Sequence, residues 1–442
     1  MKTNPLPALL AASLLVSALT LPTAALAFTE VARGSLTLST TGRVAYDSNL
    51  MGNATGQGDT VFTLAPTLNY NRAAGLGSIS ASAGVAVNRY VDLTSLNSDD
   101  ITSSLRIALP TPDGARQQGA ITAGYTDTSD IDETVGERIR SKTWRTGFSG
   151  TYRAGTRTDL RTNFNYSDTT RGSALSSSSG PGIPAGVARE STQWGGGAGF
   201  DYNGFLGGFG LSGDYRYSDT QSSAATIAGS SIDQASHSVS SGLFYRFTSG
   251  LRASADVGYR WIDRSATETA SGQTNNNGMT FGIKLDGPFL PASRFPKLKS
   301  SFSIGLEKGQ SLGINDTGST TVVGNISLAW QARERTALTI SASRSQGLSS
   351  GNQSSVDNTV RLGATQRIGE RTSLSATLGQ DWNSYPGTGR SDRRSRGGLN
   401  LGYSLNKNWQ TGAAYSATLS SSSSAKFDYD RHLVSAFVAC TF

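Results

Sequence analysis

Apolar and polar residues alternate one by one in segments of about ten residues that recur from position 35 to the last residue. In 251–263, apolar side chains occupy the odd positions from Leu251 to Trp261, and Arg252 and Arg260 are among those at the even positions. A period of two places these two sets on opposite faces of a β-strand. The same division occurs in 160–168 and 374–382. The pattern therefore predicts an all-β chain of amphipathic strands.

The connections between these segments are alternately short and long. Turns such as 153–157 and 333–336 are short and basic, whereas 169–190 and 220–235 are longer and rich in Ser, Gly, Asn or Thr. Short periplasmic turns and long external loops are typical of outer-membrane barrels. Strands that rise toward the long loops often end in an aromatic residue shortly before Asp, which predicts an aromatic girdle at the level of the outer headgroups. The predicted girdle residues are Tyr46, Tyr125, Tyr166, Tyr217, Trp261 and Trp382.

The number of alternating segments predicts twenty strands, with eighteen as the alternative. In hydrocarbon every backbone N–H and C=O must be paired within the protein, so a spanning sheet has to close on itself. We therefore expect a transmembrane, antiparallel, up-and-down β-barrel of the outer-membrane type over 35–442. A β-propeller has a similar repeat length but needs four strands in each blade. Only 28–34 separate the predicted signal peptide from the first strand, so we expect no plug domain.

The N-terminal segment has the features of a secretory signal peptide. Lys2 precedes an apolar stretch from Leu6 to Leu21, and Ala25-Leu26-Ala27 is a small-residue cleavage pattern. An uncleaved anchor helix is the alternative, which Pro22 and the cleavage pattern disfavour. We predict a cleaved signal peptide at 1–27, a short periplasmic segment at 28–34 and a barrel at 35–442. The expected location is the outer membrane of a Gram-negative bacterium, with its lipid as a partner.

The composition agrees with a sheet that has one polar and one apolar face. The 442 residues are 16% charged and 36% hydrophobic, and they include 16 Phe, 15 Tyr and 6 Trp. Disordered chains have few aromatic residues and a high net charge, so disorder is excluded. One Cys and two His exclude a disulfide framework and a cysteine-based metal centre. We expect no cofactor, no metal and no nucleic-acid partner.

Two histidines are the only candidates for hydrolytic chemistry. His237 and His432 fall near the upper ends of strands, where a Ser–His or Asp–His pair would act as nucleophile and base. Serine is so common in this chain that its proximity carries no information, and a solvated rim histidine is the simpler interpretation. Gly195–Gly199 lies inside a strand pattern with no helix to follow it, unlike a phosphate-binding loop. We expect no catalytic residue and no enzymatic activity.

The polar faces of the strands carry more basic than acidic residues, thirteen against nine. In one interpretation these charges pair across neighbouring strands and stiffen the wall. In the other, the excess of arginine makes the lumen prefer anions. The predicted basic residues of the lumen are Arg43, Arg106, Arg145, Arg153, Arg161, Arg216, Arg246, Arg252, Arg260, Arg361, Arg367, Lys284 and Lys299.

The last strand and two short motifs resemble known outer-membrane proteins. Val434, Ala436, Val438, Cys440 and Phe442 share one face, and a final strand that ends in Phe resembles the signal read by the barrel-assembly machinery. Together with 46–49 (Tyr-Asp-Ser-Asn) and 371–374 (Arg-Thr-Ser-Leu), it resembles the β-barrel porins associated with exopolysaccharide biosynthesis and export.

That resemblance implies an outer-membrane conduit that works with periplasmic polysaccharide-export proteins. Aromatic residues on which sugars stack would then be expected in the lumen, and only Phe244 and Phe437 are placed there. Three functions follow from the sequence: a porin-like channel for diffusion or export of polar solutes, a structural or surface-display barrel without transport, and a hydrolase. The channel is the favoured hypothesis.

Overall fold

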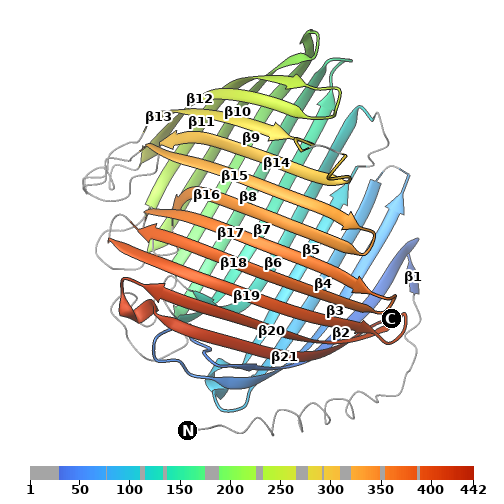
Figure 1. Cartoon of the computed structure of the whole chain (residues 1–442), viewed down its shortest axis with the longest axis vertical. Coiled ribbons are helices and arrows are strands. Elements are labelled where there is room, and N and C mark those ends of the chain that lie inside the picture. The colour runs from blue at the N-terminus through green and yellow to red at the C-terminus, as the bar shows by residue number, and fades with distance from the viewer. Residues whose placement is uncertain are drawn as a thin grey trace.

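The computed structural model describes residues 29–75, 77–109, 115–132, 137–174, 189–224, 232–264, 277–290, 293–308, 320–348, 354–385 and 389–442. Figure 1 shows their strands as one tilted sheet that curves round on itself. The predicted signal peptide, 1–27, lies outside the described residues. No helix in the described part of the chain is long and apolar enough to cross a bilayer.

Twenty strands, β2 to β21, form a closed antiparallel barrel in which each strand pairs with its neighbours in the chain and β2 pairs with β21. The additional strand β1 (Thr29–Val31) pairs only with the start of β2. The strands are β2 (Gly34–Asp47), β3 (Asp59–Ala74), β4 (Gly77–Tyr90), β5 (Ser98–Ala108), β6 (Gln117–Asp132), β7 (Glu137–Arg153), β8 (Thr158–Ala174), β9 (Arg189–Leu206), β10 (Phe209–Ala224), β11 (Ile232–Arg246), β12 (Arg252–Arg264), β13 (Gly278–Asp286), β14 (Leu298–Lys308), β15 (Thr320–Arg333), β16 (Thr336–Leu348), β17 (Ser354–Ile368), β18 (Thr372–Tyr385), β19 (Arg390–Ser404), β20 (Trp409–Ser422) and β21 (Tyr429–Thr441).

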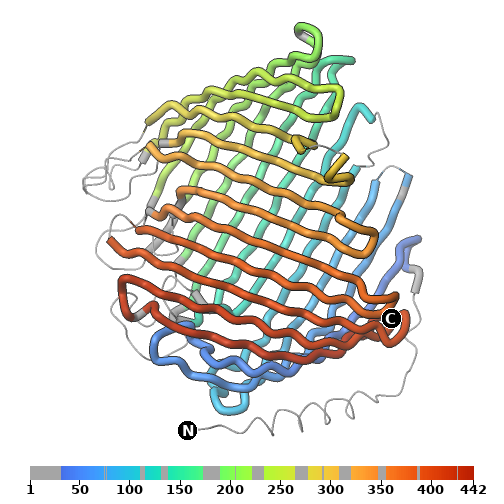
Figure 2. Tube along the Cα trace, in the orientation of Figure 1, coloured from blue at the N-terminus to red at the C-terminus, as the bar shows by residue number. Residues whose placement is uncertain are grey.

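The seam between the first and last strands closes the barrel. Leu38 and Phe442 exchange two backbone hydrogen bonds, of 3.0 and 2.8 Å. Further along the seam, Arg431 Nη2 lies 2.5 Å from Asp47 Oδ2. Figure 2 shows β2 beside β21, although the two strands are at opposite ends of the sequence. Both β1 and the C-terminus lie at the end of the barrel that carries the short turns, which is periplasmic in outer-membrane barrels.

Every predicted strand corresponds to an observed one, so the alternative of eighteen strands is wrong. Several strands continue beyond the predicted bounds toward the long loops. For example, β8 extends to Ala174, six residues past the predicted end at Asp168. A transmembrane β-strand needs about 9–11 residues, so the longer strands project beyond the bilayer. The central parts of the predicted loops, including 175–188 and 265–276, lie outside the described residues.

The outer face carries the large apolar side chains. In β18 the outward residue Leu378 is 61% exposed, and Leu362, its neighbour across β17, is exposed on the same face. In water such exposure would be costly, whereas in a bilayer these side chains contact lipid. The alternation of the sequence therefore becomes an apolar exterior around a polar interior.

Candidate functional site

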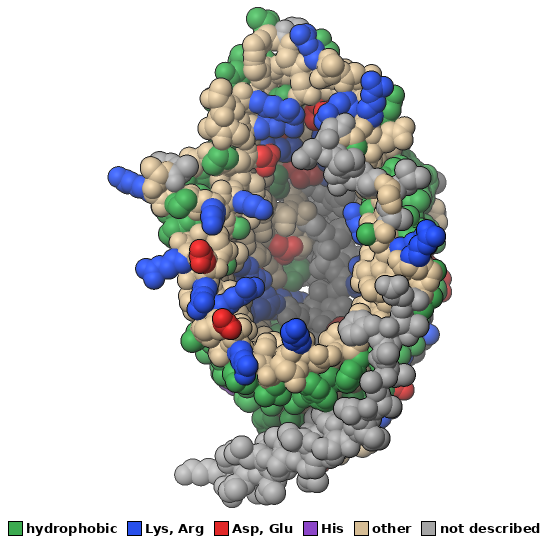
Figure 3. All heavy atoms as spheres, turned by 90° about the vertical axis from the view of Figure 1, so that its right-hand side faces the viewer, with side chains coloured by type: hydrophobic (Ala, Val, Ile, Leu, Met, Phe, Trp, Pro, Cys, Tyr) green, Lys and Arg blue, Asp and Glu red, His purple; other side chains and the backbone are tan. Residues whose placement is uncertain are grey.

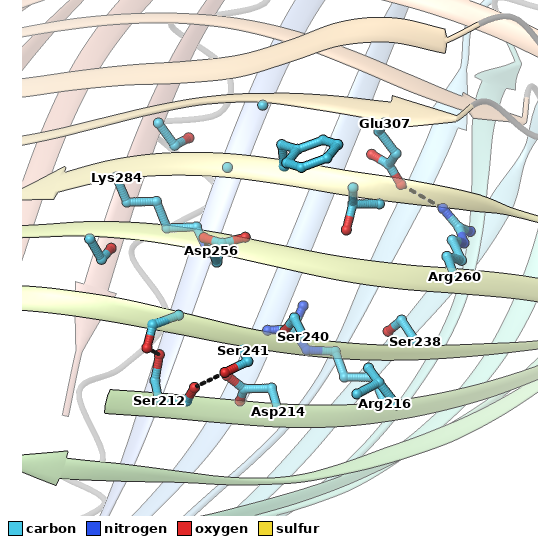
Figure 4. A pocket seen from close by; sticks show the side chains of 18 of the residues that line it. Ser212, Asp214, Arg216, Ser238, Ser240, Ser241, Asp256, Arg260, Lys284 and Glu307 are labelled. Atoms are coloured by element: carbon cyan, nitrogen blue, oxygen red, sulfur yellow. Dashed lines mark hydrogen bonds and ion pairs between the residues drawn. The ribbon is translucent and has the colours of Figure 1, made fainter. Parts of the chain in front are cut away.

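A polar hollow occupies the inner wall between β8 and β15. Its volume is about 750 Å³, and small polar residues such as Asn163, Ser212 and Ser240 contribute to its lining. Figure 4 shows the labelled serines and charged residues on the strands that line it. Because the strands alternate in facing, the side chains that point into this hollow come from alternate residues of each strand. The site is therefore a stretch of lumen wall.

One group of charges in the hollow joins four strands. Arg161 Nη2 of β8 lies 3.4 Å from Asp201 of β9 and 3.2 Å from Asp214 of β10. Asp201 also lies 3.3 Å from Arg252 Nη2 of β12. Each contact crosses at least one strand boundary, so the group ties the wall together as the ladder interpretation expects.

A second group lies on β11 to β14. Arg260 Nη1 is 2.5 Å from Glu307 Oε1, and its Nε donates to Ser236 Oγ at 3.2 Å. Lys284 Nζ is 3.3 Å from Asp256 Oδ1. The Arg260–Glu307 and Lys284–Asp256 contacts are visible in Figure 4. All four charged side chains remain partly exposed, so each pair adds only about 0–1 kcal/mol to stability.

Glycines opposite the acidic residues give their carboxylates room. Gly199 faces Asp214 across β9 and β10, and Gly282 faces Asp256 across β12 and β13. A Cβ atom on either glycine would collide with the carboxylate oxygens of its neighbour. The glycines in these strands therefore allow the acidic side chains to lie across the wall toward Arg161 and Lys284. Gly199 belongs to the glycine run predicted to be part of a strand, and it lies within β9.

The charges in the hollow are balanced. The excess of arginine that the sequence indicates for the whole lumen is therefore not found in this part of the wall. The basic residues that line it are Arg161, Arg216, Arg252, Arg260 and Lys284, and the acidic ones are Asp201, Asp214, Asp256, Asp286 and Glu307.

An inward phenylalanine is covered by arginine. Phe244 is only 2% exposed. The guanidinium carbon of Arg252 lies 4.0 Å from the centre of its ring, and that of Arg246 lies 5.4 Å away. Cation–π contacts of this kind stabilise both partners. Because the ring is covered, Phe244 offers no free face on which a sugar could stack.

The remaining predicted lumen residues are placed as follows. Arg361 Nη1 is 2.6 Å from Asp381 Oδ1, and Arg153 Nε is 3.3 Å from Asp159 Oδ1. Arg43 lines a smaller cavity near the seam, and its buried Nε has no hydrogen-bond partner among the described residues. Arg106, Arg145, Arg216, Arg367 and Lys299 are exposed, and none has an ion pair with another described residue.

A cluster of charges at the long-loop end was not predicted from the sequence. Arg390 and Arg394 hold the carboxylate of Asp392, at 2.5 and 3.3 Å, and Ser422 Oγ donates to it at 2.7 Å. Arg396, from the same strand, pairs with Asp381. Alternation alone places these residues on the inner face. The density of arginine in 390–396 is the feature of the sequence that indicates a charge cluster.

Two connections at the long-loop end lie against the inner wall. Leu50, from the connection 48–58, is 2% exposed and forms a small apolar cluster with Tyr90 of β4 and Leu96. Asp59 Oδ2 accepts hydrogen bonds from the backbone N–H groups of Asp92 and Leu93, at 3.0 and 2.8 Å. These contacts fix the two connections over β2 to β5 and narrow the mouth there.

The predicted girdle residues lie near the long-loop end. Tyr125 packs on Trp144 with ring centres 4.4 Å apart, and Tyr217 on Trp194 at 4.8 Å. Tyr46 and Trp382 are exposed, and Trp261 stacks on His237. Tyr166 is half-buried and lies opposite Trp194 across β8 and β9.

A second aromatic belt, not predicted, lies at the short-turn end. It includes the pairs Phe209–Tyr245, Phe295–Trp330 and Trp409–Phe442. Two belts separated by an apolar band are expected where a barrel crosses both bilayer interfaces.

Both histidines belong to the outer face. His237 Nδ1 lies 3.0 Å from the Tyr215 hydroxyl, and His432 Nδ1 lies 2.9 Å from the Tyr415 hydroxyl. His237 is opposite Tyr217 on β10 and opposite Trp261 on β12, and so points away from the lumen. His237 Nε2 also lies 4.0 Å from Asp263 Oδ2. The absence of enzymatic activity stays a prediction.

A protein-family model matches the part of the chain that forms the last seven strands. Residues 317–442 match the model of the family described as "putative beta-barrel porin 2". This match confirms the porin resemblance inferred from the sequence. No curated protein sequence matches the chain.

Solved structures share the fold at very low sequence identity. The ferric-catecholate import receptor Fiu from E. coli matches with a TM-score of 0.52 and 9% identity, over 92% of this chain and 81% of that one. The siderophore receptor PirA from Pseudomonas aeruginosa matches at 0.51 and 10%, and the copper transporter OprC at 0.50 and 10%; each match covers 92% of this chain and 80% of the other. At such identities the similarity concerns the fold alone.

These matches correct the predicted fold class. The closed barrel of twenty antiparallel strands stands, but the assignment to a class of barrels without a plug domain is wrong. The solved structures that share the fold are receptors and transporters, and large outer-membrane transporters have a plugged lumen. The alternation of apolar and polar residues indicates which face of a strand contacts lipid. Barrels with and without a plug share this pattern, so it cannot distinguish them.

Proposed function

We propose that this chain forms a water-filled channel that carries polar solutes across the outer membrane. The observation that supports the proposal most strongly is the 750 Å³ hollow, whose lining combines serine, asparagine and glycine with paired charges. Such a surface is well hydrated and presents hydrogen-bond donors and acceptors to a passing solute. The porin family match and the transporters among the solved structures also support a transport role.

Exopolysaccharide is the class of solute that the family resemblance suggests. The covered ring of Phe244 argues against a path of stacked aromatic residues. We propose instead that a hydrated polymer would pass along serine and asparagine side chains such as Ser240 and Asn163. Periplasmic export proteins and the barrel-assembly machinery are the partners that this proposal implies.

A structural or surface-display barrel without transport is the second candidate. The apolar cluster of Leu50, Tyr90 and Leu96 supports it, because the two fixed connections narrow the mouth over part of the wall. The two candidates differ in one property that can be measured directly, which is the passage of small polar solutes through the lumen.

We expect liposomes that contain the purified protein to swell in solutions of small neutral sugars. A paired cysteine test, in a Cys440→Ala background, locates the path. Ser240→Cys lines the hollow, so a water-soluble thiol reagent should label it and reduce conductance. Leu243→Cys, on the apolar outer face of the same strand and 53% exposed, should remain unlabelled in a bilayer. Swelling no faster than in empty liposomes would contradict the channel and favour the display barrel.

A further inference from the structure

The described connections at the short-turn end of the barrel are rich in basic side chains. Among the described residues, the connections at the short-turn end carry eight basic side chains and two acidic ones. Figure 3 looks onto this end and shows Lys and Arg side chains gathered around the opening. The basic residues are Arg33, Arg116, Arg157, Arg294, Lys297, Arg335, Arg371 and Lys407, and the acidic ones are Glu334 and Glu370.

Three cations of this end converge on one hollow. Lys297 from the 287–297 connection, Arg335 from the β15–β16 turn and Arg367 from β17 line a space of about 460 Å³. Glu334 lines it too, which leaves two positive charges in excess. All three cationic side chains are exposed, and none forms an ion pair with another described residue. The hollow is thus a concentration of uncompensated positive charge.

The backbone holds these cations in place. The Arg367 N–H donates to the Arg335 carbonyl at 2.9 Å, which joins the two arginines. Trp330 Nε1 donates to the Pro296 carbonyl at 3.1 Å and packs against Phe295 with ring centres 5.3 Å apart. These contacts anchor the segment just before Lys297.

Lys297 itself has a φ of 60°. This left-handed conformation is unusual for a residue other than glycine, and residues in it are held there by their surroundings. The position of Lys297 beside the two arginines is therefore built into the connection.

The hollow also faces the lumen. Gln331 and Thr365, which line it, lie on the inner faces of β15 and β17, on the same side as Arg361 and Arg367. Further along the wall the charges are balanced, as in the 750 Å³ hollow. The uncompensated positive charge therefore lies at the periplasmic mouth, where a solute would meet it first. Fixed charge at a mouth raises the local concentration of oppositely charged solutes.

We propose that Lys297, Arg335 and Arg367 form a binding site for polyanions at the periplasmic mouth. The ligand class is a soluble molecule that carries several phosphate or carboxylate groups, because guanidinium pairs with both in bidentate geometry. This inference names a solute class for the proposed channel and rests on that proposal for its role in transport. Binding itself does not depend on conductance.

The test is calorimetry of the detergent-solubilised protein with tripolyphosphate, oligogalacturonate and neutral dextran as separate probes. We expect at least one of the two anionic probes to bind, and dextran not to bind. The comparison of tripolyphosphate with oligogalacturonate distinguishes phosphate from carboxylate ligands. Lys297→Gln, Arg335→Gln and Arg367→Gln together should weaken binding about tenfold, because three exposed charge contacts are lost. The matched control neutralises Lys142, Arg344 and Arg393. These residues lie near the long-loop ends of β7, β16 and β19, so their loss should leave binding unchanged.

Side-specific block in planar bilayers completes the test. The bound polyanion should reduce current when added at the short-turn side and not at the other side. Equal loss of binding in both triple variants, or binding only to anionic lipid added to the detergent, would overturn the proposed site. Normal polyanion binding by a protein that conducts no ions would instead contradict the channel while leaving the site intact.

Discussion

Replacing Asp392 with alanine should lower the free energy of unfolding by about 3–5 kcal/mol, the cost of removing one partner from a buried ion pair. The Asp392 side chain is fully buried between two arginines and also accepts a hydrogen bond from Ser422. The substitution leaves Arg390 and Arg394 without this carboxylate, and their side chains are only 10% and 5% exposed. Urea unfolding in detergent micelles, followed by tryptophan fluorescence, measures the effect.

Asp286→Ala is the matched control for this prediction. Asp286 is also on the inner wall, but it is exposed and has no ion pair with another described residue. Its removal should change the free energy of unfolding by less than about 0.5 kcal/mol, as expected for a surface substitution. Equal losses in the two variants would show that the Asp392 cluster does not contribute the stability assigned to it.

Placing arginine at Leu378 should destabilise the barrel by about 2–4 kcal/mol, the cost of a cation on the lipid face near the bilayer midplane. Leu378 is near the middle of β18 and has Leu362 and Gly397 as its outer-face neighbours. Unfolding in lipid vesicles, compared with the unmodified protein, measures this cost.

Thr377→Arg is the adjacent control on the opposite face. Thr377 points into the lumen, where its cross-strand neighbours are Gly363 and Gly398, so an arginine side chain has room and water. We expect little loss of stability from this variant. If Thr377→Arg were the more damaging of the two, the assignment of inner and outer faces would be reversed.

Strand positions and facing were predictable from the sequence because they depend on a local property. The alternation around Leu251–Trp261 needs no knowledge of distant residues, and the strand β12 lies where it predicts. The aromatic residue near the end of many rising strands is likewise local. These features place Tyr217 and Trp261 in the outer belt without reference to their partners.

Contacts between strands were not predictable, because they depend on register and on segments far apart in the chain. Arg161 and Asp214 are 53 residues apart, and Arg431 and Asp47 are 384 apart. The connection that holds Leu50 has no alternation, so nothing in it indicated that it lies against the inner wall. The hollow at Lys297 depends on two connections and on strand β17, which strand pairing brings together.

The central claim is that the apolar exterior contacts lipid while the polar interior contacts water, and the six native tryptophans test it without substitution. The register places Trp144, Trp194 and Trp382 on the outer face, with Trp144 59% exposed. Trp261, Trp330 and Trp409 face outward as well. In bilayers, lipids brominated near the headgroup should quench most of the tryptophan fluorescence, and aqueous iodide should quench little. Strong quenching by iodide with none by brominated lipid would contradict the account.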